Sequence, residues 1–545
     1  MAVWMALSNR SVTPYMADNT TTTTSAGGQP ATAPSAAVQV GKVYLVGAGP
    51  GDPGLITLRG KYLLERAQVV VYDHLANPKL LKFVPPAAEL IYAGKRGGIK
   101  HTFTQPQISR MLVEKAQAGF KVVRLKGGDP FIFGRGAEEI EELVKHNIPF
   151  EVVPGVTSAT AAATYAGIPI THREYTSSVA FITGHEDPTK PGSNIAWDKL
   201  ATGAGTIVIY MGIKNLPIIT KNLIKYGRDP KTPVAVVRWA STPEQRSVVG
   251  TLETISDIVI NAKIKPPSLI VVGEVVNLRD KIDWFEKRAL FGKRILITRT
   301  RDQASELVSL LEEAGANCLE FATISIVQPD SHTIIDQALT DIGRYDWLLF
   351  TSLNAVKYFF ARLFEKNMDA RDLQGLKIGV VGKATADALA TYCLKADLIP
   401  EQFTGEGLAA SLLEQGVQGK KILLPRAQDA REVLVDRLTA GGAEVTVAPV
   451  YKNIRPTDQT TALRREFEEK NIDMVTFTSS STVTNFLKML GAENQEELDR
   501  LLDGVLIAAI GPITANTARK NGLTIHIQPE KHTIPEMVTS IIAHG

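Results

Sequence analysis

From Lys42 to the C-terminus, short runs of β-branched and other apolar residues alternate with longer stretches that have the spacing of amphipathic helices. In the first half, the strand-like runs are Val43–Val46, Val69–Tyr72, Val122–Leu125, Ile207–Met211 and Ile270–Val272. Strands that alternate with helices are typical of parallel sheets, because a parallel connection needs a crossover. The pattern therefore predicts an α/β chain whose parallel sheets are covered by helices on both faces.

The length of the chain predicts several such units. With 545 residues and about 150 per domain, roughly three to four domains are expected. A second series of strands begins at Arg294, with the run Ile295-Leu296-Ile297-Thr298. Between the two series, residues 278–293 are charged and aromatic, with only one glycine, Gly292, and no serine, so they lack the composition of a flexible linker. We expect a short, stiff connector at a domain boundary there.

Composition excludes several classes of protein. Hydrophobic residues make up 44% and charged residues 21%, which excludes wholesale disorder. Lys and Arg total 60 against 57 Asp and Glu, too balanced for a dedicated nucleic-acid binder. No apolar run approaches the ~18 residues of a spanning helix. Two cysteines, Cys318 and Cys393, cannot alone form a disulfide framework or a zinc site. We expect a soluble cytoplasmic protein without a metal.

Residues 1–40 differ from the rest of the chain. They contain a Thr tract, Thr20 to Thr24, and a stretch rich in Gly, Ala, Pro and Ser, with almost nothing that could form a core. We interpret them as a disordered leader. A secretory signal would need a longer apolar region. A transit peptide stays open, because Asp18 is the only acid in the segment.

The second half contains an internal repeat. The run Thr351–Val356 resembles Thr478–Val483, and about thirty residues later Val381–Ala386 resembles Ile510–Ala515. Both pairs are offset by about 127 to 129 positions. Any turn from strand to helix favours Gly, Ser and Thr as caps, so a single pair would carry little weight. Two pairs in register favour a duplication that produced two similar α/β lobes.

A glycine-rich loop follows the first strand, from Val46 to Pro53. It suggests a dinucleotide fold, since the next strand ends at Asp73, where an acid could bind ribose. Two details argue against that interpretation. Asp52 occupies the third glycine position, where its carboxylate would repel a diphosphate, and Pro50 lacks an N–H for a phosphate cradle. A ligand without phosphates, such as a positive sulfonium, fits better.

Two further loops follow later strands. The segment Lys126–Gly136 begins Lys-Gly-Gly-Asp-Pro; its paired glycines permit close approach of a ligand, and Asp129 can accept hydrogen bonds from a ribose or an amino group. The segment Val153–Ala159 supplies hydroxyl groups at a helix start. Each alone could be an ordinary βα turn, but three loops in this order are far more specific.

Together these motifs make residues 41–284 resemble uroporphyrinogen-III C-methyltransferase, a tetrapyrrole methylase that uses S-adenosylmethionine. The motifs that carry the resemblance are Val-Gly-Ala-Gly-Pro-Gly-Asp from Val46, Val-Tyr-Asp ending at Asp73, Ala-Gly-Lys ending at Lys95, Leu-Lys-Gly-Gly-Asp-Pro-Phe-Ile-Phe-Gly-Arg from Leu125, Pro-Gly-Val-Thr-Ser from Pro154, Gly-Ile-Pro-Ile-Thr-His-Arg ending at Arg173, Tyr-Met-Gly around Met211 and Pro-Ser-Leu-Ile from Pro267. The chain departs from the family at His74, where Arg is common, which leaves one contact with a substrate carboxylate open.

The resemblance implies roles for individual residues. S-adenosylmethionine would contact Pro50, Gly127, Gly128, Asp129, Ile132, Thr157, Ser158, Met211 and Ala240. Asp73 matches the family's proposed general base and Lys95 its proposed proton donor. The alternatives are a strand-end cap for Asp73 and pairing with a substrate carboxylate for Lys95. The substrate is an octacarboxylate, whose expected partners include Arg124, Arg135 and Arg173, together with Lys95, Arg96 and His172.

Residues from about 291 to the C-terminus resemble uroporphyrinogen-III synthase. The cues are Gly292-Lys293-Arg294, Thr298-Arg299, Phe350-Thr351-Ser352, Val381-Gly382 with Thr385, Leu424-Pro425-Arg426, Pro449-Val450-Tyr451, Phe477-Thr478-Ser479 and Ile510-Gly511 with Thr514-Ala515. By resemblance, the chain crosses between two lobes near residues 327–330 and again near 451–456. The reaction closes hydroxymethylbilane, inverts its last ring, releases water and needs no cofactor.

The synthase resemblance indicates possible ligands rather than essential groups. Helix N-termini with Ser352, Thr385, Ser479 and Thr514 would bind acetate and propionate groups of the substrate. Tyr451 could hydrogen-bond or protonate the departing hydroxyl. The alternative for each serine and threonine is an ordinary helix cap.

The sequence thus predicts a bifunctional enzyme of tetrapyrrole synthesis. We expect a disordered leader at 1–40, a methylase at 41–284 with lobes at about 41–155 and 156–284, a linker at 285–291 and a synthase at 292–545. The synthase would have one lobe at about 292–327 and 456–545 and another at about 330–450. Its product, uroporphyrinogen III, would be methylated at C2 and C7 to precorrin-2. By resemblance, the methylase half forms a homodimer. The alternatives are a dinucleotide-dependent oxidoreductase and a second half that only binds a carboxylated ligand.

Overall fold

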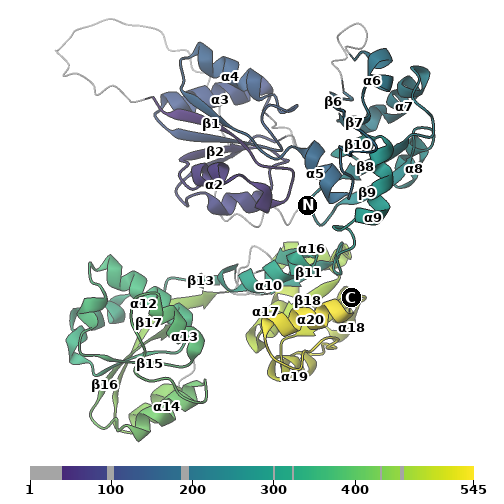
Figure 1. Cartoon of the computed structure of the whole chain (residues 1–545). Coiled ribbons are helices and arrows are strands. Elements are labelled where there is room, and N and C mark those ends of the chain that lie inside the picture. The colour runs from purple at the N-terminus through teal and green to yellow at the C-terminus, as the bar shows by residue number, and fades with distance from the viewer. Residues whose placement is uncertain are drawn as a thin grey trace, which may run out of the picture.

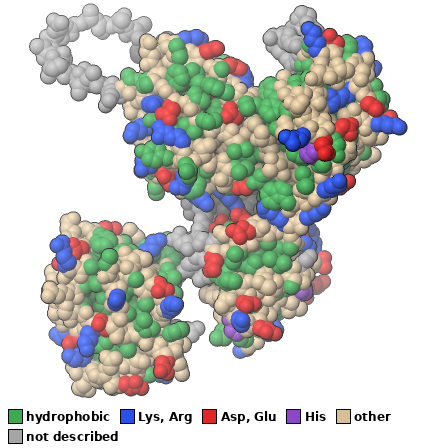
Figure 2. Space-filling view, viewed as in Figure 1, with side chains coloured by type: hydrophobic (Ala, Val, Ile, Leu, Met, Phe, Trp, Pro, Cys, Tyr) green, Lys and Arg blue, Asp and Glu red, His purple; other side chains and the backbone are tan. Residues whose placement is uncertain are grey.

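The computed structural model describes residues 40–94, 103–185, 195–298, 301–321, 325–429, 433–454 and 460–544. Most of the predicted leader, residues 1–39, lies outside them. Four sheets, each with its own helices, form four α/β bodies (Figure 1). On the face shown in Figure 2, acidic and basic side chains are interspersed, as the near balance of charges leads one to expect.

The first sheet has the strand order β3(Glu89–Tyr92)-β2(Val69–Tyr72)-β4(Lys121–Lys126)-β1(Lys42–Gly47)-β5(Phe150–Val153), and all of its pairs are parallel. Alternate residues of β2 face opposite cores. Val69 and Val71 pack against α3(Gln105–Gln117) and α4(Gly136–Lys145), while Val70 packs on the side of α2(Leu58–Leu64). The prediction of a parallel sheet covered on both faces is confirmed here.

The second sheet has the order β6(Val179–Thr183)-β7(Thr206–Tyr210)-β10(Ser268–Val272)-β8(Pro233–Arg238)-β9(Arg246–Thr251). Only β6 and β7 pair in parallel; the other pairs are antiparallel. The expectation of parallel strands was therefore wrong for most of this sheet. The reason is the short segment 239–245 between β8 and β9, which permits a hairpin but not a crossover.

Helices cover both faces of the second sheet. One face packs against α5(Ser158–Tyr165), where Ala159 and Ala162, with Ala166 at the C-cap, let the helix approach closely. The other face packs against α6(Trp197–Gly203), α7(Leu216–Lys225) and α8(Ile255–Asn261). After η4(Glu274–Leu278) and α9(Arg279–Ile282), the chain runs to β11 without a further helix or strand.

The segment between the second and third sheets is packed along its length. The indole of Trp284 donates a 3.1 Å hydrogen bond to the carbonyl of Thr164. Phe285 is 5% exposed, with its ring centroid 4.7 Å from that of Tyr165. Leu290 is fully buried in the core that follows. This packing explains why a connector with a single glycine and no serine is suitable here.

The third sheet, β12(Asn317–Glu320)-β11(Arg294–Ile297)-β18(Met474–Phe477)-β19(Leu506–Ala509), is parallel throughout. The fourth has the order β13(Ser325–Val327)-β17(Glu444–Ile454)-β16(Lys421–Ala427)-β14(Trp347–Phe350)-β15(Lys377–Val380). Its pairs are parallel except β13 with β17. The helices of these two bodies are α10(Arg301–Glu313), α11(Thr333–Thr340), α12(Leu353–Glu365), α13(Lys383–Ala390), α14(Gly405–Glu414), α15(Val433–Ala440), α16(Thr460–Glu468), α17(Ser480–Leu490), α18(Gln495–Leu502), α19(Pro512–Lys520) and α20(Ile534–His544).

The third and fourth sheets repeat one plan, which confirms the predicted pair of similar lobes. Apart from β13, the order β12-β11-β18-β19 matches β17-β16-β14-β15. Ser352 and Ser479 cap α12 and α17 with nearly the same backbone angles, φ −161° and ψ 155° against φ −160° and ψ 159°. Each sheet combines two strands from each copy of the repeat, so the chain must cross between the lobes.

Within the described residues, no helix is long and apolar enough to cross a bilayer. Among the same residues, no cluster of three or more His, Cys, Asp and Glu side chains could hold a metal ion.

Candidate active sites

The three glycine-containing loops of the first half meet at the carboxyl end of its first sheet. Gly49 and Gly128 form an isolated antiparallel bridge, in which the N–H of Gly128 donates a 2.8 Å hydrogen bond to the carbonyl of Gly49. A Cβ on Gly47 would lie 2.5 Å from the nitrogen of Gly155. Gly128 has φ +69°, a conformation that glycine adopts without strain. The predicted loops therefore pack closely against one another, backbone to backbone.

Asp129 holds two of these loops together. Its side chain is 9% exposed, and its carboxylate accepts hydrogen bonds from the N–H of Phe131 at 2.8 Å and of Gly155 at 3.0 Å. Both oxygens therefore have backbone donors before any ligand arrives. The remaining lone pairs are those that a ribose or amino group would use.

Asp52 joins the first loop to the body of the second sheet. Its carboxylate accepts hydrogen bonds from the N–H of Gly54 at 2.7 Å and from the phenol of Tyr165 at 2.8 Å. Its own N–H donates to the hydroxyl of Ser241 at 3.2 Å. Burial, with the hydrogen bond to Asp52, raises the pKa of Tyr165, so the phenol remains a donor. Asp52 thus places an anion where a dinucleotide-binding loop would have a glycine.

The second body supplies an apolar wall beside these loops. Ile132 packs with Ala240, which is 8% exposed, in the core beneath α5. Thr157, the residue before α5, lies 2.6 Å through its hydroxyl from the phenol of Tyr210. Met211, next to Tyr210, is 52% exposed and has φ +53°. Ser158, at the first turn of α5, and Pro50 are half-buried.

Several non-glycine residues in these loops have left-handed backbone conformations. They are Phe133, Arg135, Met211, Trp239 and Ser241, with φ between 48° and 63°. Such conformations cost of order 1–3 kcal/mol each and cluster at ligand sites. Their concentration in the loops that face one another supports a binding site between the first two bodies.

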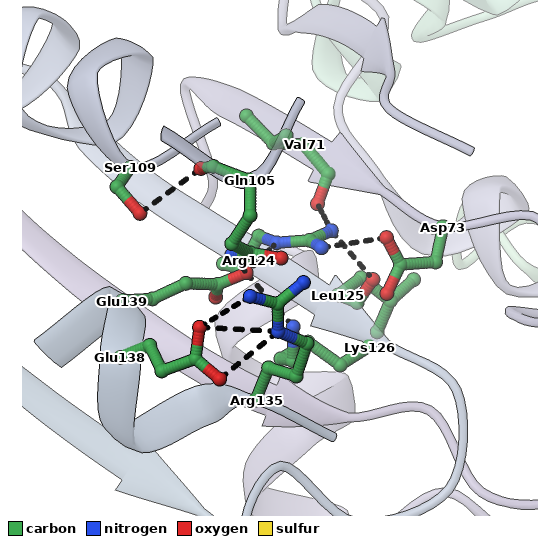
Figure 3. A network of polar contacts seen from close by, with 10 residues as sticks. All are labelled: Val71, Asp73, Gln105, Ser109, Arg124, Leu125, Lys126, Arg135, Glu138 and Glu139. Carbon is green, nitrogen blue, oxygen red and sulfur yellow. Dashed lines mark hydrogen bonds and ion pairs between the residues drawn. The ribbon is translucent and has the colours of Figure 1, made fainter. Parts of the chain in front are cut away.

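Asp73, at the end of β2, is paired with a buried arginine (Figure 3). Arg124 donates a 2.6 Å hydrogen bond to Asp73 and lies 3.2 Å from Glu139. The side chain of Arg124 is only 2% exposed, whereas that of Asp73 is 25% exposed. Arg124 therefore faces the interior. It was expected to bind the substrate, but its buried side chain pairs with Asp73 and Glu139 instead. Asp73 is the member of the pair that can meet a ligand.

In the second half, Ser352 and Tyr451 lie together although 99 positions separate them. Their hydroxyl oxygens are 3.2 Å apart, and the ring of Tyr358 stacks on Tyr451 at 5.6 Å. Burial raises the pKa of Tyr451, although its hydrogen bond to Ser352 opposes that effect. The phenol is therefore protonated at neutral pH, as a proton donor must be.

Comparisons with known proteins match both halves. The family model "Tetrapyrrole (Corrin/Porphyrin) Methylases" matches residues 42–256, and "Uroporphyrinogen-III synthase HemD" matches residues 305–539. The "Porphyrin biosynthesis protein HemD" of Ruminiclostridium josui is 39% identical over 507 residues, which cover 93% of this chain and 98% of that protein. The chain belongs to the tetrapyrrole methylase and uroporphyrinogen-III synthase families.

Two further relatives match the methylase half. The "S-adenosyl-L-methionine-dependent uroporphyrinogen III methyltransferase" of Methanosarcina barkeri is 54% identical over 240 residues, covering 44% of this chain and 94% of that protein. A solved structure, "Uroporphyrin-III C-methyl transferase from Thermus thermophilus complexed with S-adenyl homocysteine", is 41% identical. It covers 44% of this chain and all of the other, with a TM-score of 0.38.

Four other residues predicted to act in the methylase half are not placed next to Asp73 by the structure. Lys95 and Arg96 lie outside the described residues. Arg135 is exposed and pairs with Glu138 three positions later, and Arg173 is exposed. Among the described residues, neither of these two arginines forms a hydrogen bond or ion pair with Asp73.

His74 lies where the two methylase lobes meet. Its Nδ1 is 3.2 Å from the hydroxyl of Tyr92 in the first lobe, and its ring is edge-on to Trp239 of the second, with centroids 6.2 Å apart. The side chain is exposed. A histidine here can therefore face a ligand between the lobes. Its imidazole cannot form the two parallel hydrogen bonds that an arginine forms with a carboxylate.

Sequence reasoning missed Glu139 and Lys126 of the methylase half. Glu139 is fully buried and accepts a 2.9 Å hydrogen bond from the amine of Lys126, which is 2% exposed. Arg124 and Lys126 occupy alternate positions of a central buried strand, so their side chains share one face. Two cations on one buried face require a buried anion nearby, which is a signal that could have led to Glu139.

The hydroxyl residues of the synthase half divide into two groups. Ser352 and Ser479 cap their own helices, accepting from the N–H of Ala355 at 3.1 Å and of Thr482 at 3.4 Å. Thr385 and Thr514 are 4% and 5% exposed. The predicted alternative, a helix-cap role, is therefore realised for the two serines.

The other two helix starts of the synthase half differ. Gly382 and Gly511 precede α13 and α19, and neither can supply a side-chain cap. Phe403 covers Gly382 and His532 covers Gly511. These two helix starts therefore lack the side-chain cap that Ser352 and Ser479 give to α12 and α17.

Proposed function

We propose that the chain is a bifunctional enzyme that makes uroporphyrinogen III and then methylates it. The C-terminal half would cyclise hydroxymethylbilane with inversion of ring D, and the N-terminal half would transfer two methyl groups to C2 and C7, giving precorrin-2. The observation that carries the proposal is the relative named for porphyrin biosynthesis that aligns across both halves. The two families are expected to catalyse consecutive reactions, because the product of the synthase is the substrate of the methylase.

The proposed methyl donor is S-adenosylmethionine, which supplies an already activated methyl group when bound. The loop surface fits it: a Cβ at Gly128 would meet only the nitrogen of Ser158, at 3.7 Å, so its backbone is open, while Leu75 packs against Gly127. Ile132 and Ala240 give an apolar wall for a ring. The carboxylates of Asp52 and Asp129 border these loops, which favours a cationic ligand over a diphosphate. Pro50, Thr157, Ser158 and Met211 complete the proposed donor site.

The proposed task of the methylase residues is to position a flexible substrate and remove a proton. Methylation of a pyrrole carbon leaves a cationic ring, and Asp73 is placed to accept the proton that this ring loses. Arg124 fixes the carboxylate from behind. Arg135 and Arg173 would pair with substrate carboxylates. Lys95 remains the proposed proton donor by family resemblance.

In the synthase half, Tyr451 would donate a proton to the departing hydroxyl of hydroxymethylbilane, so that it leaves as water. Ser352 would orient the phenol through their 3.2 Å contact. The N-terminal ends of the helices that carry Thr385, Ser479 and Thr514 would bind the acetate and propionate groups. Holding the linear substrate in a closed shape would be a large part of the catalysis.

The proposal extends to the organisation of the chain. We propose a methylase unit at 41–284, a linker at 285–291 and a synthase unit at 292–545, in a cytoplasmic protein that dimerises through its methylase half and does not act on nucleic acid. Purifying residues 41–284 and 292–545 separately and measuring their masses by light scattering would test both the boundaries and the dimer.

One experiment tests the central proposal. The full chain is incubated with hydroxymethylbilane and S-adenosylmethionine, and the product is examined by mass spectrometry. The expected product is uroporphyrinogen III with two added methyl groups. Formation of unmethylated isomer I, the spontaneous product, would overturn the proposal for both halves. Unmethylated isomer III would overturn it for the methylase half.

A further inference from the structure

Behind Asp73 lies a closed network of buried charges. Arg124, Lys126 and Glu139 are each at most 2% exposed, and they are joined by ion pairs of 2.6 to 3.2 Å to one another and to Asp73. Two cations and two anions make the network neutral. Figure 3 shows Arg124 between the carboxylates of Asp73 and Glu139. We call these four residues the buried tetrad.

Glu139 is the anchor of the buried tetrad. Its Oε1 accepts hydrogen bonds from Gln105 at 2.9 Å, Lys126 at 2.9 Å and Arg124 at 3.2 Å. Its Oε2 is buried and has no hydrogen-bond partner among the described residues. An unpaired charge at such a depth would cost several kcal/mol, so each charge here depends on the others.

Only one member of the buried tetrad reaches a ligand. The side chain of Asp73 is 25% exposed, whereas the other three are almost completely covered. Burial lowers the pKa of Lys126, and Arg124 adds to that effect. Burial alone would raise the pKa of Glu139, but Arg124 and Lys126 lower it. The charges of Lys126 and Glu139 can therefore act on a substrate only through Asp73.

We propose that Glu139 and Lys126 are positioning residues that set the basicity of Asp73 through Arg124. Arg124 alone would stabilise the carboxylate of Asp73 and make it a weak base. Glu139 shares the charge of Arg124 and opposes that effect, and Lys126 balances Glu139. The inference deepens the proposed methylase function and rests on it, because Asp73 must be the base for its basicity to matter.

Other charged groups near Asp73 are few among the described residues. Arg124 and Lys126 come from β4 and Glu139 from α4. On its own segment, Asp73 is followed by His74, which contacts Tyr92 of β3. His74 and Tyr92 are unchanged in the variants proposed below, so their effect on the pH profile is constant.

The test uses charge changes of opposite sign. In Glu139→Gln a negative neighbour of Arg124 is lost, so Arg124 stabilises the carboxylate of Asp73 more strongly, and the acid limb of kcat against pH moves down by about 0.5 to 1 unit. In Lys126→Met a positive neighbour is lost, and the limb moves up by a similar amount. The double variant restores the balance and returns the limb toward that of the wild type. Substrate carboxyl groups titrate identically in all variants, so differences between profiles belong to the protein.

Controls separate this inference from the proposed function. Glu141→Gln removes an exposed carboxylate from the same helix and should leave the profile unchanged. Binding of S-adenosylhomocysteine, measured by calorimetry, should remain within about twofold in both single variants. A wild type that binds this ligand but transfers no methyl group would overturn the proposed function. Active variants whose limbs shift in the same direction, or not at all, would overturn the inference alone.

If Glu139→Gln fails to fold, the pH profile of Lys126→Met alone still tests the inference. An upward shift of its acid limb supports the inference, and an unchanged or downward limb contradicts it. If both single variants unfold, the double variant is the test. A double variant that folds and has an unshifted acid limb supports the inference of charge balance. A double variant that does not fold, or whose acid limb is shifted, contradicts that inference.

Discussion

The phenol of Tyr165, in α5, donates a 2.8 Å hydrogen bond to the carboxylate of Asp52, in the first glycine loop. The two residues are 113 positions apart and belong to different lobes. The same tyrosine ring packs against Trp284 and Phe285 of the connector, with centroids 5.2 and 4.7 Å away. Tyr165 therefore holds the proposed donor loop against both the second lobe and the segment that leads to the synthase half.

Replacing Tyr165 by Phe should weaken binding of the methyl donor without disrupting the connector. The variant keeps the aromatic contacts and loses only the hydrogen bond to Asp52. We expect the Kd for S-adenosylhomocysteine to rise about fivefold, or roughly 1 kcal/mol, as measured by calorimetry. Tyr226→Phe, at a half-exposed tyrosine of the same lobe, is the control. Equal Kd values for both variants would show that the hydrogen bond does not order the loop.

Substitution of Gly155 by Ala should break the meeting of the three loops. The added methyl group would lie 2.3 Å from the carbonyl oxygen of Gly128 and 2.8 Å from Cα of Gly47, both of which are backbone atoms that cannot rotate away. We expect a loss of stability of about 1–3 kcal/mol and binding of S-adenosylhomocysteine at least tenfold weaker. Thermal unfolding and calorimetry would measure the two effects.

The matched control for this change is Gly203→Ala, since a Cβ at Gly203 would meet nothing within 4 Å. It should bind S-adenosylhomocysteine as the wild type does. Wild-type affinity in Gly155→Ala would mean that the loops are free to separate and that their packing does not define the site.

Tyr451→Phe should reduce the synthase reaction about a hundredfold, since general-acid groups contribute roughly 10²–10⁴. The ring that stacks on Tyr358 is retained, so stability should change little. Hydroxymethylbilane would then close spontaneously to isomer I, which chromatography separates from isomer III. Methyl transfer to supplied uroporphyrinogen III should be unaffected.

A second tyrosine of the same lobe gives the control for Tyr451. Tyr392 stacks on Phe360 with centroids 4.1 Å apart, and Tyr392→Phe removes a hydroxyl without removing the stack. It should produce isomer III at the wild-type rate. A similar loss in both variants would assign the effect of Tyr451→Phe to general destabilisation.

Local features of this chain could be predicted from the sequence. The strands Val43–Val46 and Val69–Tyr72 fall within β1 and β2, because a buried parallel strand has a strong apolar signal over few residues. The internal repeat was also visible in the sequence. Its two serines, Ser352 and Ser479, cap their helices with nearly the same backbone angles, because a helix cap depends on a few neighbouring residues. Such features depend on neighbours within a few positions.

Features that depend on distant residues could not be predicted. The antiparallel pairing of β10 with β7 and β8 depends on how the chain returns to the sheet. Arg124 was expected to meet substrate, because nothing local shows that Glu139 takes the space behind it. The contact of Ser352 with Tyr451 likewise requires the strands of two repeats to combine in one lobe.

Asp336 of α11 should make the fourth body sensitive to acid. Arg362 and Lys366 hold the pKa of its carboxyl at about 2. Because that pKa is depressed, the stabilisation is fully present above about pH 4 and is lost as pH falls toward 2. After allowance for partial exposure, Asp336→Asn should cost about 1 kcal/mol at pH 7 and much less near pH 2. Hydrogen-exchange mass spectrometry of peptides from α11 and α12, at several pH values, would measure the difference. A cost that stayed constant from pH 7 to pH 2.5 would show that packing, rather than the ion pair, joins these helices.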